Sequence, residues 1–249
     1  MISVLDRLQS FTAARFSPEG QFGLHLTVGV AFLLGAMAVF ARLAGAVVAG
    51  APITQLDAEI AMWLHLHARD GGLLRDGMLV LTHMHSTPGV LAIAAVVGIW
   101  LVRRGHRYWP MALVAAVPGG MLLNVALKHT FERTRPHFEE PILTLTTYSF
   151  PSGHTMAATV LYGLLGCYCA RHARSWIGRV LPFVLAALMV GAIAFSRMYL
   201  GAHYLSDILA ALVEGCGWLA VCISAAATLN RRRAARERRE AGTAPPQEI

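Results

Sequence analysis

The sequence has few charged residues for its length. Asp, Glu, Lys and Arg make up 14% of its 249 residues, whereas hydrophobic residues make up 56% and the mean hydropathy is +0.54. Ordinary soluble domains carry about 25% charged residues, so this chain has too little polar surface to cover its apolar side chains. The composition excludes a disordered chain, a coiled coil and a nucleic-acid-binding module. It predicts an all-α protein that crosses a membrane several times.

Cysteine is also scarce, and its spacing matches no redox or zinc-binding motif. The four cysteines lie inside apolar segments, and none belongs to a Cys-x-x-Cys motif. A redox motif or a zinc knuckle is therefore unsupported. The pairs His65-x-His67 and His83-x-His85 lack a carboxylate or cysteine at a spacing that would complete a ligand set. We expect no metal site and no cofactor.

Six apolar runs are candidates for membrane-spanning helices, each of which needs about 20 residues. They are Leu24–Val48, Pro88–Val102, Trp109–Leu127, Thr155–Ala170, Val180–Phe195 and Ile208–Leu229. Several are short, so we expect their helices to extend into the flanking segments. The predicted organisation is a cytoplasmic segment over 1–23, a six-span bundle over 24–229 and a disordered basic tail over 230–249. Leu56–Arg69 has an amphipathic pattern that predicts a helix at the membrane interface, with Leu56, Ile60, Trp63 and Leu64 on one face.

The positive charges are distributed unevenly between alternate connections. With the N-terminus in the cytoplasm, 14 of the 21 Lys and Arg residues fall on the inner side and six on the outer side. The positive-inside rule therefore predicts that both termini are cytoplasmic. The basic tail is expected to contact anionic membrane lipids and not nucleic acid.

Three motifs lie in the predicted outer connections. The first is Lys128 followed after six residues by Arg135-Pro136, and the second is Pro151-Ser152-Gly153-His154. The third is Ser196-Arg197, then five residues, His203, then three residues and Asp207. All three fall where a loop meets an apolar helix, so we expect them to converge at one face of the membrane.

These residue types suit the binding of an anion. Lys128, Arg135 and Arg197 supply three positive charges, and arginine matches phosphate oxygens in a bidentate manner. Ser152 and Gly153 precede an apolar helix, whose first N–H groups can bind an anion. His203 and Asp207 are four residues apart and are adjacent on a helix. Together with His154, they give an anion site that contains two histidines.

The three motifs closely resemble those of the type 2 phosphatidic acid phosphatase family, which is related in its core to the vanadium haloperoxidases. The resemblance covers roughly residues 86–229, with the core motifs over 128–207, and implies a haloperoxidase-like phosphatase core. It implies that His203 is a nucleophile oriented by Asp207 and that His154 is the general acid. It further implies that phosphate is bound by Lys128, Arg135, Ser152, Gly153 and Arg197 without a metal.

The expected function is hydrolysis of a phosphomonoester or diphosphate of an amphiphilic lipid, through a phosphohistidine, at the outer face of a bacterial inner membrane. Candidate substrates include undecaprenyl diphosphate, our first choice, phosphatidylglycerophosphate and phosphatidic acid. No nucleic acid and no obligate protein partner are expected. A non-catalytic lipid-phosphate transporter or binding protein, and a phosphatase for a soluble sugar phosphate, remain as alternatives.

Four further polar residues have open roles. Glu214 lies within the sixth apolar run, where a carboxylate is costly, and Asn124 precedes Lys128 by one helical turn. Asn124 could support Lys128 or form a hydrogen bond between helices. Asp57 and Glu59 lie on the predicted interfacial helix, either at the substrate entrance or, as we prefer, in contact with solvent.

Overall fold

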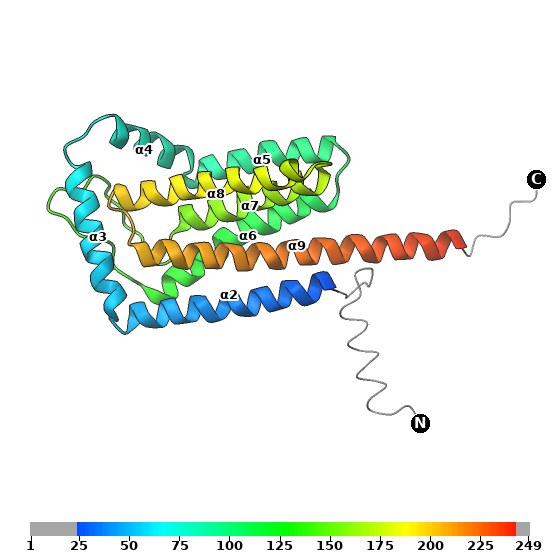
Figure 1. Ribbon diagram of the computed structural model, residues 1–249, viewed down its shortest axis with the longest axis horizontal. Helices are drawn as coiled ribbons and strands as arrows, with labels where there is room; N and C mark the ends of the chain where they lie inside the picture. The colour runs from blue at the N-terminus through cyan, green and yellow to red at the C-terminus, as the bar shows by residue number, and fades with distance from the viewer. Residues whose placement is uncertain (1–23, 243–249) are drawn as a thin grey trace, which may run out of the picture.

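The computed structural model describes residues 24–242, and this part of the chain is helical without a strand (Figure 1). Its helices are α2 (Leu24–Val48), α3 (Pro52–Ala68), α4 (Leu73–Met84), α5 (Thr87–Arg103), α6 (Tyr108–Phe131), α7 (Gly153–His172), α8 (Trp176–Tyr199) and α9 (Leu205–Gly242). The predicted all-α class is therefore confirmed. The predicted segment over 1–23 lies outside the described residues.

A helix lies at each of the six predicted spans, but the number of spans is not confirmed as six. Within residues 24–242, four helical segments are long and apolar enough to cross a membrane: Leu26–Val48, Tyr108–Phe131, Trp176–Tyr199 and Leu205–Glu237. Helices α4 and α5 give a fifth if this pair, bent by 59°, crosses as one unit. Helix α7 is buried along most of its first three turns and carries Thr155 and Thr159 there, so it is less apolar than a lipid-facing helix.

The core lies between α5, α6, α7 and α9. Its fully buried side chains include Val90, Val117, Met156 and Leu161. Helix α2 packs along α9 at the edge of the bundle, and most of its large apolar side chains are exposed. Apolar side chains that face outward along several long helices are what a bilayer requires.

Helix α3 lies across one end of the bundle, next to the first turn of α9 and the end of α8 (Figure 1). A helix in this segment was predicted and is present, but the face that packs on the bundle is not the predicted apolar face. The buried residues are Asp57, Ala61, Leu64, His65 and Ala68, whereas Leu56 and Trp63 are exposed. The buried face contains a carboxylate and a histidine, so hydrophobicity alone did not identify it.

The C-terminal helix is longer than the sequence predicted. We expected a disordered tail from residue 230, but α9 continues to Gly242. An ion pair between Arg233 and Glu237, four residues apart on this helix, contributes to this extension. The basic residues after residue 230 therefore belong to a helix, at the end of the bundle opposite α3 (Figure 1).

Candidate active site

The three sequence motifs meet at the end of the bundle that α3 covers. Lys128 lies in the last turn of α6, Gly153 and His154 begin α7, and Arg197 lies in the last turn of α8. Arg135 comes from the loop between α6 and α7, and His203 from the short connection between α8 and α9. These six residues line one cavity of about 250 Å³.

His203 is held by groups on both sides of its ring. Its Nδ1 lies 3.3 Å from Asp207 Oδ2, and its Nε2 lies 3.2 Å from Arg135 Nη1. A proton on Nδ1, facing the carboxylate, leaves the lone pair of Nε2 available. Burial lowers the pKa of His203 well below its usual value, and Arg135 and Arg197 lower it further, while Asp207 acts in the opposite direction. This shift favours the neutral ring at pH 7, the form in which an imidazole nitrogen can act as a nucleophile.

Asp207 lies behind His203 and is fully buried, outside the cavity lining. Its Oδ2 accepts a hydrogen bond from the Ser149 hydroxyl. The same oxygen accepts a second hydrogen bond from the backbone N–H of Tyr204 at 2.9 Å. Its Oδ1 accepts from Arg133 at 2.6 Å. These donors stabilise the ionised carboxylate and fix which oxygen faces the imidazole.

Arg135 is fixed by the loop from which it comes. Its Nε donates to Thr147 O at 2.7 Å and its Nη2 to Tyr148 O at 3.1 Å, while its Nη1 donates to Ala202 O at 2.7 Å. Burial lowers its pKa from the usual arginine value, with Asp207 acting in the opposite direction. An arginine keeps its charge under such a shift, so the guanidinium is a fixed cation beside His203.

Lys128 and Arg197 supply the other two charges. Lys128 Nζ donates to Tyr148 O at 2.7 Å and to Ser149 O at 3.3 Å. Arg197 is 3% exposed and donates from Nη1 to Thr82 Oγ1 at 2.5 Å, but its buried Nε has no partner among the described residues. A buried N–H donor without a partner is costly, so this group can serve a ligand.

The start of α7 combines a glycine with a histidine. A methyl group at residue 153 would lie 3.1 Å from Asn124 Oδ1 and 3.9 Å from Lys128 Cε, so glycine keeps this wall of the cavity open. The first N–H groups of the helix lack carbonyl partners within it and can meet an anion. His154 lines the same cavity.

Ser152 differs from the other predicted phosphate-binding residues. It is fully buried and does not line the cavity. Its hydroxyl accepts a hydrogen bond from Thr155 at 3.1 Å, and its N–H donates to the backbone oxygen of Asp207 at 3.1 Å. Ser152 thus joins the start of α7 to the start of α9, and its contact with phosphate remains a prediction.

Sequence reasoning missed two residues of the site and misplaced a third. Arg133 and Ser149 both bond the carboxylate of Asp207. Asp57 was expected in solvent, but it is fully buried and pairs with Arg133 at 2.8 Å. The only signal for Arg133 was its position between Lys128 and Arg135. No signal in the sequence linked Asp57 to a loop 76 residues away.

Asn124, Glu214 and two of the histidines considered as metal ligands have hydrogen-bond or ring contacts with other side chains. Asn124 lines the cavity and donates to Glu214 Oε2 at 2.8 Å, which joins α6 to α9. His65 stacks on Phe138, and His85 bonds the Tyr162 hydroxyl at 2.5 Å. Within residues 24–242, no group of three or more His, Cys, Asp or Glu side chains could hold a metal ion.

The geometry is that of an anion site built around a buried histidine–carboxylate pair, and comparisons with known proteins identify its family. The PAP2 superfamily matches residues 107–231, which is half of the chain and includes all three motifs. The chain belongs to the PAP2 superfamily.

A sequence match and a structural match, both to proteins from Bacillus subtilis, accompany this assignment. Over 138 residues, the chain is 29% identical to a protein of strain 168 named phosphatidylglycerophosphatase B, covering 55% of this chain and 67% of that protein. The fold matches the crystal structure of a transmembrane PAP2-type phosphatidylglycerolphosphate phosphatase, with a TM-score of 0.68 and 23% identity. This match covers 76% of the present chain and 93% of the other. The protein is an integral membrane phosphatase of the PAP2 superfamily.

Proposed function

We propose that this PAP2 phosphatase hydrolyses phosphatidylglycerophosphate through a covalent phosphohistidine on His203, without a metal ion. The observation that carries the proposal is the surroundings of His203. One ring nitrogen faces a buried carboxylate, and the other faces a cavity that Lys128, Arg135 and Arg197 also line. A dianionic phosphate in this cavity would lie among three positive charges and beside a neutral nucleophile.

In the first step, the lone pair of His203 Nε2 attacks phosphorus and the bond to the ester oxygen breaks. His154 enters this step as an imidazolium: burial and Arg197 lower its pKa to about 3 in the free protein, and the bound phosphate dianion raises it. His154 donates this proton to the ester oxygen, so the lipid leaves as an alcohol. Negative charge on the phosphoryl oxygens is stabilised by the two arginines and by Lys128. The positive charge that develops on the imidazole is stabilised by Asp207, which is 3.3 Å from Nδ1.

In the second step, water attacks the phosphorus of the phosphohistidine. His154, now neutral, accepts a proton from this water, and the bond between phosphorus and Nε2 breaks. Inorganic phosphate is released and both histidines return to their starting states. Each residue in the cycle belongs to this chain, and no step needs a cofactor.

The walls of the cavity support a lipid substrate. Its polar end carries the cations, while Val90, Met121 and Val125 line it on α5 and α6. A headgroup can therefore bind the charges while the tail remains beside apolar helix surfaces. The name of the 29%-identical relative is the reason that we propose phosphatidylglycerophosphate rather than undecaprenyl diphosphate, the substrate we first expected. We further propose that the site faces the periplasm of a bacterial inner membrane.

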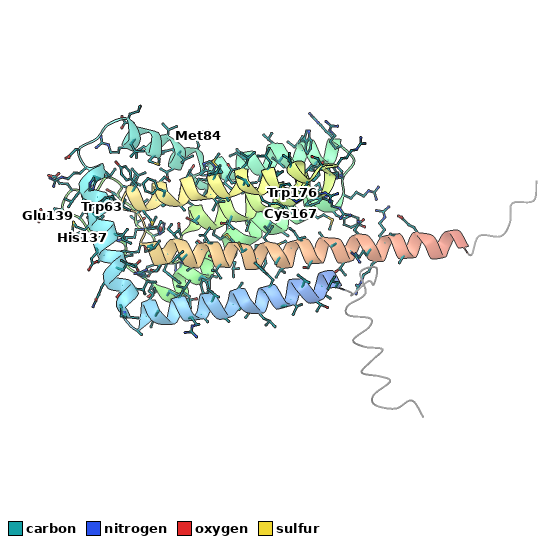
Figure 2. All side chains as sticks on the ribbon, viewed as in Figure 1. Trp63, Met84, His137, Glu139, Cys167 and Trp176 are labelled. Carbon is teal, nitrogen blue, oxygen red and sulfur yellow. The ribbon has the colours of Figure 1, made fainter. Side chains whose placement is uncertain are left out.

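The decisive experiment measures phosphate release by the purified protein in detergent with excess EDTA, alongside His203→Ala. We expect phosphatidylglycerophosphate to give the highest kcat/KM in a panel with undecaprenyl diphosphate, phosphatidic acid and glucose 6-phosphate. His203→Ala should abolish turnover, because it removes the ring that Asp207 orients and that would form the phosphohistidine. The matched control is His137→Ala, an exposed histidine of the α6–α7 loop that does not line the cavity (Figure 2).

Several results would contradict the proposal. Turnover in His203→Ala would exclude the phosphohistidine, and loss of activity in EDTA that Mg²⁺ restores would exclude metal independence. Equal turnover of glucose 6-phosphate would favour a soluble substrate. Absence of phosphate release, together with saturable binding of the lipid, would favour the transporter.

A further inference from the structure

Helix α3 carries a carboxylate that is buried at the active-site end of the molecule. Asp57 has no exposed surface, although Glu59, two residues later on the same helix, is exposed. Burying an ionised carboxylate is strongly unfavourable unless hydrogen bonds and an opposite charge compensate it. The partners of Asp57 therefore indicate what this helix contributes.

The main partner of Asp57 is Arg133, which bridges two buried carboxylates. Arg133 Nη2 lies 2.8 Å from Asp57 Oδ2, and its Nη1 lies 2.6 Å from Asp207 Oδ1. The guanidinium also stacks over the ring of Tyr204, with 4.3 Å from Cζ to the ring centroid. Each end of the planar fork is fixed by one carboxylate, so Arg133 keeps a single orientation.

Asp57 also holds the first turn of α9 directly. Ser206 donates its backbone N–H to Asp57 Oδ1 at 2.9 Å and its hydroxyl to Oδ2 at 2.5 Å. Ser206 immediately precedes Asp207, whose other oxygen faces His203. Asp57 is thus connected to Asp207 in two ways, through the side chain of Arg133 and through the backbone of Ser206.

We propose that Asp57 is a positioning residue for the nucleophile: through Arg133 and Ser206, it holds the Asp207 carboxylate in the orientation that serves His203. This inference rests on the proposed role of His203. It assigns part of the catalytic geometry to α3, which lies outside the region matched by the superfamily.

The charges explain why a carboxylate is needed at this position. Asp57, Arg133 and Asp207 together carry one net negative charge, which stabilises the positive charge that His203 acquires when it attacks phosphorus. In Asp57→Asn, Arg133 would neutralise Asp207 alone, and the amide would direct one N–H toward existing donors. Asp57 does not line the cavity, so phosphate binding should be preserved.

The test compares Asp57→Asn with Glu59→Gln, which removes an exposed carboxylate from the same helix. Removing a hydrogen-bond partner that orients a metal ligand typically costs about 10–100-fold in activity, and Asp57 orients Asp207 in the same manner. We expect a loss of this size in kcat for Asp57→Asn, with KM and the Ki of inorganic phosphate within about threefold of wild type. Glu59→Gln should be unchanged. A kcat for Asp57→Asn within about twofold of wild type would overturn the inference.

A structural role is distinguished by the other measurements. If Asp57 only anchored α3, its substitution would raise KM and the phosphate Ki and lower the melting temperature, while kcat would change little; that result would overturn the proposal. Arg133→Lys, which cannot bridge two carboxylates in a bidentate manner, should lower kcat similarly. The double variant should lose little more activity than either single variant, because the two residues act as one unit. Additive losses would contradict this coupling.

Two further controls keep the outcomes separate. If Asp57→Asn does not fold, Ser206→Ala removes a hydrogen bond from Asp57 but keeps its charge, and we expect about a threefold to tenfold loss in kcat. An unchanged kcat in that variant would then overturn the inference. If the wild-type protein has no His203-dependent activity, the proposed function fails; if it is active and Asp57→Asn matches it, only this inference fails.

Discussion

Three arginines near His203 carry the same guanidinium group, but their partners give them different roles. Arg135 is fixed by carbonyl oxygens and faces His203, and Arg197 has a buried N–H beside the cavity that finds no partner in the described part of the chain. Arg133 does not line the cavity and joins two carboxylates. The first two are suited to phosphate, whereas the third is suited to positioning Asp207. At this scale, the function of a residue depends on what its donors already bond.

Gly153 permits a residue-scale prediction about phosphate binding. A methyl group at this position would project toward Asn124 and Lys128, in the space where the phosphate is proposed to lie. We expect Gly153→Ala to raise the Ki of inorganic phosphate about tenfold, equivalent to about 1.4 kcal/mol, with the fold retained. Competitive inhibition of lipid hydrolysis measures this Ki. The control is Gly191→Ala, where a methyl group meets no atom within 4 Å; equal values in both variants would remove Gly153 from the phosphate site.

At the scale of helices, the site depends on how closely α7 and α9 approach one another. These helices carry His154 and Asp207, and the bond from Ser152 N–H to Asp207 O joins their first turns. Small residues let helix backbones come close inside a membrane. Gly215 is such a residue: a methyl group there would lie 2.8 Å from Thr159 Cβ and 3.3 Å from Met156 O.

Gly215→Ala is therefore expected to destabilise the bundle. Overpacking costs about 1–3 kcal/mol, and each kcal/mol lowers the melting temperature by about 2–4 °C in a chain of this size. The matched variant is Gly35→Ala on α2, where a methyl group meets no atom within 4 Å and helix propensity improves by about 1 kcal/mol. In thermal unfolding measured in detergent, only Gly215→Ala should have a lower midpoint temperature than the wild type. A similar rise in both variants would show that α7 and α9 can separate at no cost.

At the scale of the whole molecule, the site and the basic helix extension lie at opposite ends. Trp63, His137 and Glu139 lie at the α3 end, together with the site, whereas the basic part of α9 extends from the other end (Figure 2). A cluster of positive charges tends to remain in the cytoplasm. The arrangement therefore supports an active site at the outer face, as the uneven distribution of charges predicted.

This topology can be tested with single cysteines in a chain whose own four cysteines are replaced by alanine. The native cysteines are Cys167, Cys169, Cys216 and Cys222. A membrane-impermeant maleimide should label Glu139→Cys, in the α6–α7 loop, on intact cells whose outer membrane admits the reagent. Arg174→Cys, in the α7–α8 connection, should be labelled only after the inner membrane is permeabilised. The reverse pattern would place the site in the cytoplasm.

The sequence predicted much of the fold and most of the site, for identifiable reasons. Apolar runs and the uneven distribution of charge indicate which segments contact lipid. This contact depends on the residues of each segment alone, so it can be predicted locally. These features predicted helices at six positions, and a helix is present at each, although six membrane crossings are not confirmed. The basic tail was predicted to be disordered, whereas α9 continues into it. The three motifs predicted the convergence of Lys128, Arg135, His154 and His203, because the ends of successive spanning helices return to one face.

What the sequence by itself determined is therefore the class of protein and the residues of its motifs. Only the tertiary structure decided which face of α3 is buried, and that Arg133 joins Asp57 to Asp207. Hydrophobic periodicity cannot identify a buried carboxylate, because its burial is stabilised by partners that are distant in the sequence. A charge becomes buried or exposed according to the groups around it, and those groups come together only when the helices pack.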